Sequence, residues 1–184
     1  MNPLQNLSIG PPASVEIRQI HRVFELAIKD AFMQEGLETH QEDIQYEINH
    51  KQERLANALH AHEPELQFLV ARAHDEVIGT ISYGPSGPLI SECTDGQLKD
   101  VGELGSLYIL PDYQNRGIGS ALISEMVQQL DKQGIEQFCL DSGYRRAQVR
   151  WTRKFGPPYA VMKDRWGPDS PHMMWLCQVR DWIK

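Results

Sequence analysis

The residues best suited to chemistry lie in one stretch, SLYILPDYQNRGIGSALISEMVQQL, residues 106–130. An apolar run ends at Pro111, a polar loop follows, and Gly117 and Gly119 precede apolar residues at helical spacing. The first backbone N–H groups of a helix have no intrahelical partner, and glycine leaves them uncovered. The helix dipole also favours negative charge there. The stretch therefore predicts a strand, a loop and a helix start that bind an anionic group such as a pyrophosphate.

Other sites that the sequence might contain do not fit. A dinucleotide fingerprint needs a third glycine where this chain has Leu122, and a Walker loop needs a Gly-Lys-Ser/Thr triplet that the chain lacks. The GPSG segment at residues 84–87 is not the G-x-S-x-G of a serine hydrolase. His60 and His62 are two positions apart, which would point them to different faces of a helix, so we expect no metal site.

The pattern Q-x-x-G-x-G opens an amphipathic helix after a strand that ends at a proline. This resembles the acyl-CoA signature of the GNAT superfamily of N-acetyltransferases, (Arg/Gln)-x-x-Gly-x-(Gly/Ala). The flanking LYILPDYQNRGIGSALI and the order of the expected elements over residues 14–180 resemble the family as well. The resemblance implies that acetyl-CoA is the acyl donor, without a metal.

The resemblance also implies which residues contact acetyl-CoA. The backbone of Leu107, Tyr108 and Ile109 would pair with the pantetheine arm like an added strand. The helix over 144–155 is strongly basic and would attract the phosphates of CoA, although a solvated helix face is the better explanation of any single arginine. The residues of the signature, whose loop and helix start would hold the pyrophosphate, are Gln114, Asn115, Arg116, Gly117, Ile118, Gly119 and Ser120.

Acyl transfer from a thioester to an amine needs a base for the amine and tolerance of the departing thiolate. In many GNAT enzymes a glutamate on the strand before the signature is the base, often through water, and Glu103 is the matching residue here. An exposed strand residue is the other interpretation of Glu103. Many members also have a tyrosine in the last helix that protonates sulfur, but this chain has Trp151 there. Because indole is no usable acid, Tyr144, Tyr159 or unassisted departure of the thiolate remain.

The elements follow from hydrophobic periodicity and turn residues. Residues 1–13 are expected to be a flexible lead-in, and residues 14–184 one α/β domain of the GNAT type with a mixed central sheet flanked by helices. The segment 85–100 is expected to be rich in turns, and the strand over 101–110 to be buried on both faces. Expected strands are 14–20, 66–74, 76–84, 101–110, 136–142, 159–163 and 172–180, and expected helices are 21–34, 42–60, 117–132 and 144–155.

Composition limits the function classes. The chain of 184 residues carries a formal charge of −7, which argues against a general nucleic-acid binder. Residues 1–100 hold seven Lys and Arg against sixteen Asp and Glu, and residues 101–184 hold eleven against nine. This asymmetry suits a cationic acceptor near the first half, but chance explains it equally well. Three scattered cysteines, no signal sequence and no long apolar run favour a cytoplasmic protein without a membrane partner.

Together these features predict an N-acetyltransferase that moves an acetyl group from acetyl-CoA to an amine of an unidentified small molecule or peptide. The alternative is a catalytically silent acyl-CoA-binding sensor or interaction module, which the missing tyrosine supports. A nucleotide-binding regulatory domain is a third hypothesis if CoA does not bind. Homodimers are common in the family that the sequence resembles.

Overall fold

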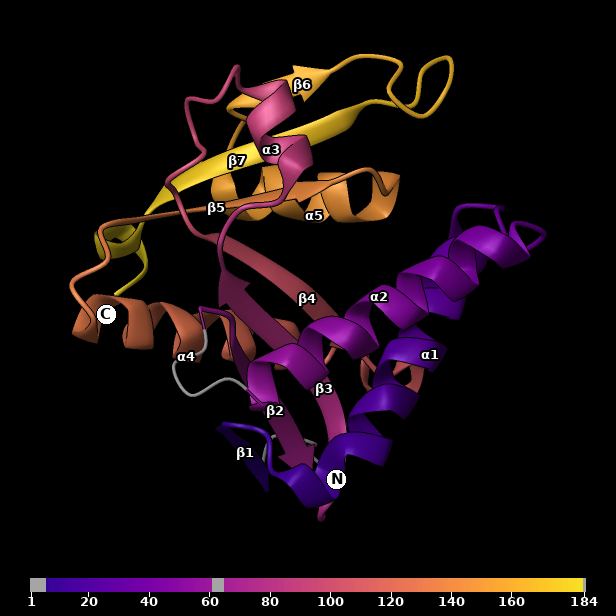
Figure 1. Cartoon of the computed structure of the whole chain (residues 1–184), viewed down its shortest axis with the longest axis vertical. Helices are drawn as coiled ribbons and strands as arrows, with labels where there is room; N and C mark the ends of the chain where they lie inside the picture. Colours follow the sequence, from indigo (N-terminus) through magenta and orange to yellow (C-terminus); the bar gives the residue numbers. More distant parts are fainter. Residues whose placement is uncertain (1–5, 61–64, 184) are drawn as a thin grey trace.

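Seven strands form one mixed sheet, in the spatial order β1-β2-β3-β4-β5-β7-β6 (Figure 1). The computed structural model describes residues 6–60 and 65–183. Neighbouring strands are antiparallel except β4 and β5, which are parallel. The strands are β1 (Leu7–Gly10), β2 (Gln67–Ala73), β3 (Glu76–Gly84), β4 (Glu103–Ile109), β5 (Gln137–Ser142), β6 (Ala160–Met162) and β7 (His172–Gln178).

Helices cover both faces of the sheet, as expected for the α/β class (Figure 1). Phe24 of α1 packs against Phe68 and Tyr108 on one face, and Leu122 of α4 approaches Gly79 on the other. No helix within the described ranges is long and apolar enough to cross a membrane. The helices are α1 (Ile17–Gln34), α2 (Gln41–His60), α3 (Pro88–Cys93), α4 (Ile118–Lys132) and α5 (Arg145–Phe155), with short 3₁₀ turns at Ser14–Glu16, Pro111–Tyr113 and Val179–Trp182.

Helix α4 shows why these residues form these elements. Its buried residues recur three and four positions apart, which gives one apolar stripe against the sheet. Gly134 ends the helix with φ of +72°, and the Ile135 N–H donates to the Leu130 carbonyl at 3.0 Å, so the predicted glycine stop is confirmed. The stripe consists of Ile118, Leu122, Ile123, Met126, Val127 and Leu130.

Strand β4 separates from β5 almost as soon as the two meet. Glu103 and Cys139 are the one pair of residues in register between them, so no strand of residues 6–60 or 65–183 lies beside the edge of β4 beyond Glu103. Figure 1 shows β4 running obliquely away from β5. An open edge presents backbone N–H and C=O groups to a ligand.

A bulge lies in the middle of β4. Thr80 pairs with Tyr108 and Ser82 with Gly105, so two residues of β4 oppose one residue of β3. Ser106 takes φ of +48°, and the Thr80 hydroxyl donates to its carbonyl at 2.7 Å. Thr80, Ser82 and Gly84 are every second residue of β3 and therefore lie on one face of the sheet. Their partners Tyr108, Gly105 and Glu103 share that face.

The expected first strand over 14–20 is wrong. Residues 14–16 form a 3₁₀ turn and α1 begins at Ile17, because Ile17, Ile20 and Phe24 fit helical spacing while Val15 is 89% exposed. Glu16 accepts the Ala13 N–H at 2.7 Å and pairs with Arg72, which fixes this start. The first strand is β1, inside the expected lead-in, and it pairs with β2.

Two further expectations need correction. The segment 85–100 contains helix α3, which has Pro88 at its first position, where the missing N–H is harmless. The end of β4 is not buried on both faces: Leu107, Tyr108 and Ile109 are half-buried, since β5 has diverged.

Gly79 tests the packing of α4 on the sheet. A Cβ added there would lie 2.7 Å from Ile109 Cδ1 and 3.1 Å from the Tyr108 carbonyl oxygen. We expect Gly79→Ala to lower the free energy of unfolding by about 1–3 kcal/mol, measured in urea, since overpacking shifts backbone. Gly10→Ala is the matched control, because its Cβ would find its nearest neighbour at 3.7 Å. Equal stability of the two variants would contradict this account.

Candidate active site

The loop before α4 has the geometry that its glycines predict. Gly117 precedes α4 with φ of +84°, a conformation that favours glycine. Gly119 differs, because its φ is not positive and an added Cβ would meet no atom within 4 Å. Neither backbone nor internal packing requires glycine at 119. Close approach of a ligand to the backbone would be a physical reason for glycine at this position.

The helix start leaves backbone donors free for an anion. The first bond of the helical ladder runs from the Ala121 N–H to the Gly117 carbonyl at 3.0 Å. The N–H groups of Ile118, Gly119 and Ser120 precede it and have no helical acceptor. Ile118 as a whole residue is 1% exposed, whereas Gly119 is half-buried and Ser120 is exposed. The donors nearest the surface are therefore those of Gly119 and Ser120, beside the open position at Gly119.

Gln114 positions the loop. Its side-chain amide donates to Asp30 Oδ2 at 3.0 Å and to the Ile109 carbonyl at 3.3 Å, which ties the loop to α1 and to the end of β4. Arg116 lies over the Tyr113 ring, 5.7 Å from its centroid. Asn115 has φ of +59°, a left-handed conformation that asparagine tolerates. The sequence signature thus contains residues that shape the loop as well as residues that face outward.

Two basic residues of α5 lie beside this loop. Arg150 donates to Asn115 Oδ1 at 3.2 Å, and Lys154 approaches Ser120 Oγ at 3.5 Å. The Arg145 guanidinium instead donates to the Asp169 carbonyl, and the Arg146 guanidinium donates to the Gln34 side chain, while the Arg146 backbone N–H donates to Glu35. The charges of the helix therefore do not all lie beside the loop. The positive potential at the start of α4 comes from Arg150 and Lys154 in addition to the helix dipole.

Glu103 lies where β4 and β5 meet, on the face covered by α2 and α3. Its Oε2 accepts the Gly87 N–H at 2.8 Å. A Cβ added to Gly105 would lie 3.3 Å from the other oxygen, Oε1, so the missing side chain leaves space beside Oε1 toward the bulge. Burial raises the pKa of Glu103, and the negative charge of Asp141 raises it further. A raised pKa makes this carboxylate a better base than an ordinary one.

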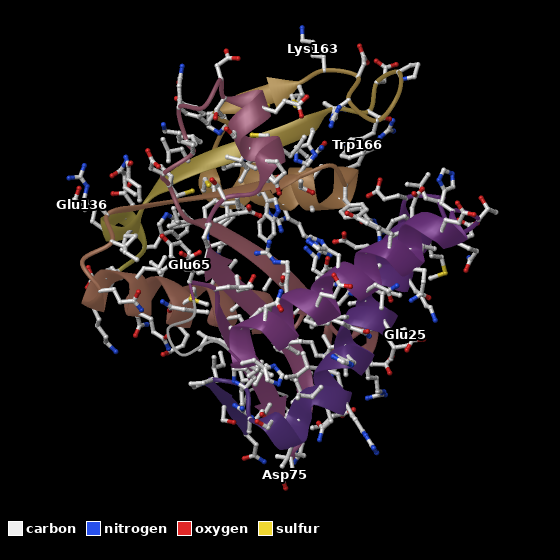
Figure 2. All side chains as sticks on the ribbon, viewed as in Figure 1. Glu25, Glu65, Asp75, Glu136, Lys163 and Trp166 are labelled. Atoms are coloured by element: carbon white, nitrogen blue, oxygen red, sulfur yellow. The ribbon has the colours of Figure 1, made fainter. Side chains whose placement is uncertain are left out.

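Asp141 and His172 are polar residues of this region that sequence analysis missed. His172 Nε2 lies 2.9 Å from Asp141 Oδ2, and the Trp166 indole N–H donates to His172 Nδ1 at 3.1 Å. Since Nδ1 accepts, Nε2 carries the proton and donates to Asp141. Figure 2 shows Trp166 on the inner side of the β6–β7 loop, near the start of α5, while Lys163 points away from the molecule. Only spatial proximity relates these residues, so no sequence motif identifies them.

Trp151 and the two candidates for the acid, Tyr159 and Tyr144, lie in different places. Trp151 packs against the core with its ring 5.7 Å from that of Phe155. The Tyr159 hydroxyl donates to Gln97 at 2.8 Å, which directs it away from β4. Tyr144 packs edge-on against Phe32, and burial, with the nearby Glu47 carboxylate, raises its pKa. The raised pKa of Tyr144 weakens it as an acid.

The comparisons with known proteins agree with this geometry. Residues 21–156 match the Acetyltransferase (GNAT) family, so the chain belongs to that family. An acetyltransferase of the GNAT family from Desulfovibrio desulfuricans superposes with a TM-score of 0.70 at 20% identity, over 94% of this chain and 99% of that one. No curated protein matches the sequence.

Two further solved structures contain coenzyme A. PaiA N-acetyltransferase from Thermoplasma acidophilum, in complex with coenzyme A, has a TM-score of 0.65 at 18% identity, over 93% of this chain and 99% of that one. An aminoglycoside 6′-N-acetyltransferase complexed with coenzyme A also has a TM-score of 0.65, at 16% identity, over 94% of this chain and 97% of that one. At these identities the likeness establishes the fold and leaves the acceptor open.

The raised pKa of Glu103 predicts how its replacement changes stability. The folded chain binds this proton more tightly than the unfolded chain, so the contribution to stability is full at low pH and is lost as pH rises through the folded pKa. Glu103→Gln keeps an acceptor for the Gly87 N–H but carries no charge. We expect it to be more stable than wild type above neutral pH, with the difference vanishing near about pH 4, the ordinary glutamate range.

Urea unfolding across this pH range measures the difference. Glu38→Gln removes an exposed carboxylate and controls for the change in net charge. A stability difference between Glu103→Gln and wild type that does not change with pH would contradict the buried-charge explanation.

Proposed function

We propose that the protein is an N-acetyltransferase that moves the acetyl group of acetyl-CoA to an amine. The observation that carries the proposal is Gly119, a glycine that the chain itself does not need. It lies at a helix start with free N–H donors, next to Arg150 and Lys154, at one end of the open edge of β4. Glu103 lies at the other end of the same edge.

The residues present fit acetyl-CoA. The backbone N–H groups of Gly119 and Ser120 and the cations of α5 would hold the pyrophosphate, and the open edge of β4 at Leu107 and Ile109 would pair with the pantetheine arm. Acetyl-CoA supplies an activated acyl group. This arrangement would place that group toward the bulge, where Gly105 leaves space beside Glu103 Oε1.

Glu103 is the base in the proposed reaction. It takes one proton from the acceptor's ammonium group, directly or through water, and the neutral amine can then form its bond to the acyl carbon. The carbon–sulfur bond breaks, and the thiolate leaves with the electron pair and takes a proton from solvent or from Tyr144. The nitrogen, now bonded to the acyl carbon, releases its second proton to solvent and becomes the amide. The amine of the acceptor is cationic at neutral pH before this step, which agrees with the expectation of a positively charged acceptor. A cytoplasmic location and a homodimer stay predictions from the sequence.

Acetyl-CoA should stabilise the protein, because it binds the folded state only. At a concentration of about 100 times Kd, we expect a rise in Tm of about 5–10 °C. Gly119→Leu should abolish this rise but leave the Tm of the unliganded protein within a few degrees, because a side chain at 119 fills open space. Gln128→Leu, at an exposed position of the same helix, is the matched control and should keep the rise. Absence of any CoA effect on wild type would refute the proposed function.

Replacing Glu103 tests the chemistry. We expect Glu103→Gln to lower kcat/KM at neutral pH by roughly 10²-fold or more while keeping the CoA-dependent rise in Tm. The rate of wild type should increase with pH to a plateau if no side chain must stay protonated. Tyr144→Phe decides the role of the acid, since loss of kcat and of a descending limb at high pH would show that Tyr144 protonates sulfur. Full activity of Glu103→Gln would contradict the base assignment.

The silent sensor remains the second candidate, favoured by Trp151 at the position of the usual tyrosine. Release of the CoA thiol in the presence of an amine panel separates the two functions. A sensor would show the CoA-dependent rise in Tm without thiol release.

A further inference from the structure

Helix α2 carries a charged stripe toward β4. Glu47, Lys51 and Arg54 are spaced four and three residues apart, so they lie on one side of the helix. The Tyr108 hydroxyl donates to Glu47 Oε1 at 2.9 Å, which places the stripe over the face of β4 that also carries Glu103. The positive charges of Arg54 and Lys51 both act to lower the pKa of Glu103, so both residues lie near it. The stripe therefore extends from Tyr108 toward Glu103.

Arg54 is the unmatched charge of this stripe. Lys51 Nζ pairs with Glu47 Oε1 at 3.3 Å, and Glu47 also accepts from Tyr108. Arg54 Nε is buried and has no acceptor, and no ion pair of Arg54 is present in the part of the chain that the structure describes. A buried N–H of a charged group without a partner is costly. The burial of Nε also holds the guanidinium in place, with its terminal nitrogens as the accessible part.

Arg54 is not the counter-ion of Glu103. The Glu103 carboxylate binds the Gly87 N–H, and burial and Asp141 raise its pKa although Arg54 and Lys51 act in the opposite direction. Among the described residues no nitrogen of Arg54 lies within ion-pair distance of a Glu103 oxygen. Arg54 thus lies near the base as a separate positive group.

We propose that Arg54 binds a carboxylate of the acceptor, and that the acceptor is therefore an amino acid. This inference rests on the proposed acetyl transfer. A guanidinium binds carboxylates through paired N–H donors. The acceptor's ammonium then faces Glu103 and Asp141 while its carboxylate faces Arg54, so each charge of a zwitterion meets its opposite. The phosphates of CoA belong to the α4 end of β4, whereas Arg54 lies near Glu103 at the start of the strand. A phosphate group beside Arg54 would be repelled by the carboxylates of Glu47, Glu103 and Asp141.

The test compares acceptors that differ in the carboxylate alone. Thiol release is measured with a panel of free amino acids, each beside its carboxamide and the amine without the carboxyl group. We expect at least one amino acid to be acetylated with kcat/KM at least about 10-fold above those of its two partners, because removing one partner of a buried charge pair has effects of this size or larger. Comparable rates within every set, or no acetylated amino acid although CoA binds, would overturn the inference.

Variants of α2 distinguish binding from an effect on the base. Arg54→Gln should raise KM for the amino acid by at least about 10-fold and abolish the discrimination against the carboxamide, with KM for acetyl-CoA unchanged. Lys51→Gln is the matched control: it also removes a positive charge near Glu103, but from a residue already paired with Glu47. It should shift the pH profile and keep the discrimination.

Arg54→Lys should recover part of the discrimination, since it restores the charge without the planar fork. If Arg54→Gln lowers kcat equally for all acceptors and behaves like Lys51→Gln, Arg54 acts through Glu103 and the inference is wrong. The rise in Tm with acetyl-CoA, measured for each variant, confirms that it is folded. Failure of wild type to bind CoA would instead refute the proposed function itself.

Discussion

The divergence of β4 from β5 is the constraint on which the rest of the structure depends. The two strands share one pair in register, Glu103 and Cys139, and then separate. In a continuous sheet, the N–H and C=O groups of β4 beyond Glu103 would bind β5, and no ligand could pair with them. The bulge at Ser106 acts on the same strand, because it brings Tyr108 to the face of Glu103 and so links β4 to Glu47 of α2.

The same divergence explains why a carboxylate with a raised pKa can persist in the fold. Glu103 lies at the last point where the sheet is continuous, so it is largely buried and close to Asp141 on the adjacent strand. The fold compensates only in part, with one backbone N–H from Gly87 and the more distant charges of Arg54 and Lys51. Full compensation by a direct ion pair would stabilise the protein but would also make Glu103 a poorer base. A carboxylate whose buried charge is only partly compensated is expected at a site of proton transfer.

Much of the fold could be predicted from sequence because its signals are local. The apolar stripe and Gly134 define α4, and the two largely apolar segments joined by the tight turn at His74 and Asp75 define β2 and β3. The start of α1 was mispredicted because Val15 and Ile17 alternate over too few residues to tell a strand from a helix. The signature loop was also predictable, since its glycines act through their own backbone. Asp141, His172 and Arg54 were not, because they are far apart in the sequence and only the fold brings them near Glu103.

The distribution of charge shows why net charge by halves is a weak guide to a binding site. The first half of the chain is acidic overall, yet it supplies Arg54 and Lys51 near Glu103. The second half is slightly basic, yet it supplies Glu103 and Asp141. Interactions between exposed charges decay over about 8–10 Å in physiological salt, so only groups within the site decide which ligand it favours.

Along β4 these local charges alternate: cations of α5 lie at the start of α4, carboxylates follow at Glu103 and Asp141, and Arg54 lies beside them on α2. A ligand set with phosphates at one end, an ammonium in the middle and a carboxylate beside it matches that order, whereas a polyamine would place a second positive charge against Arg54.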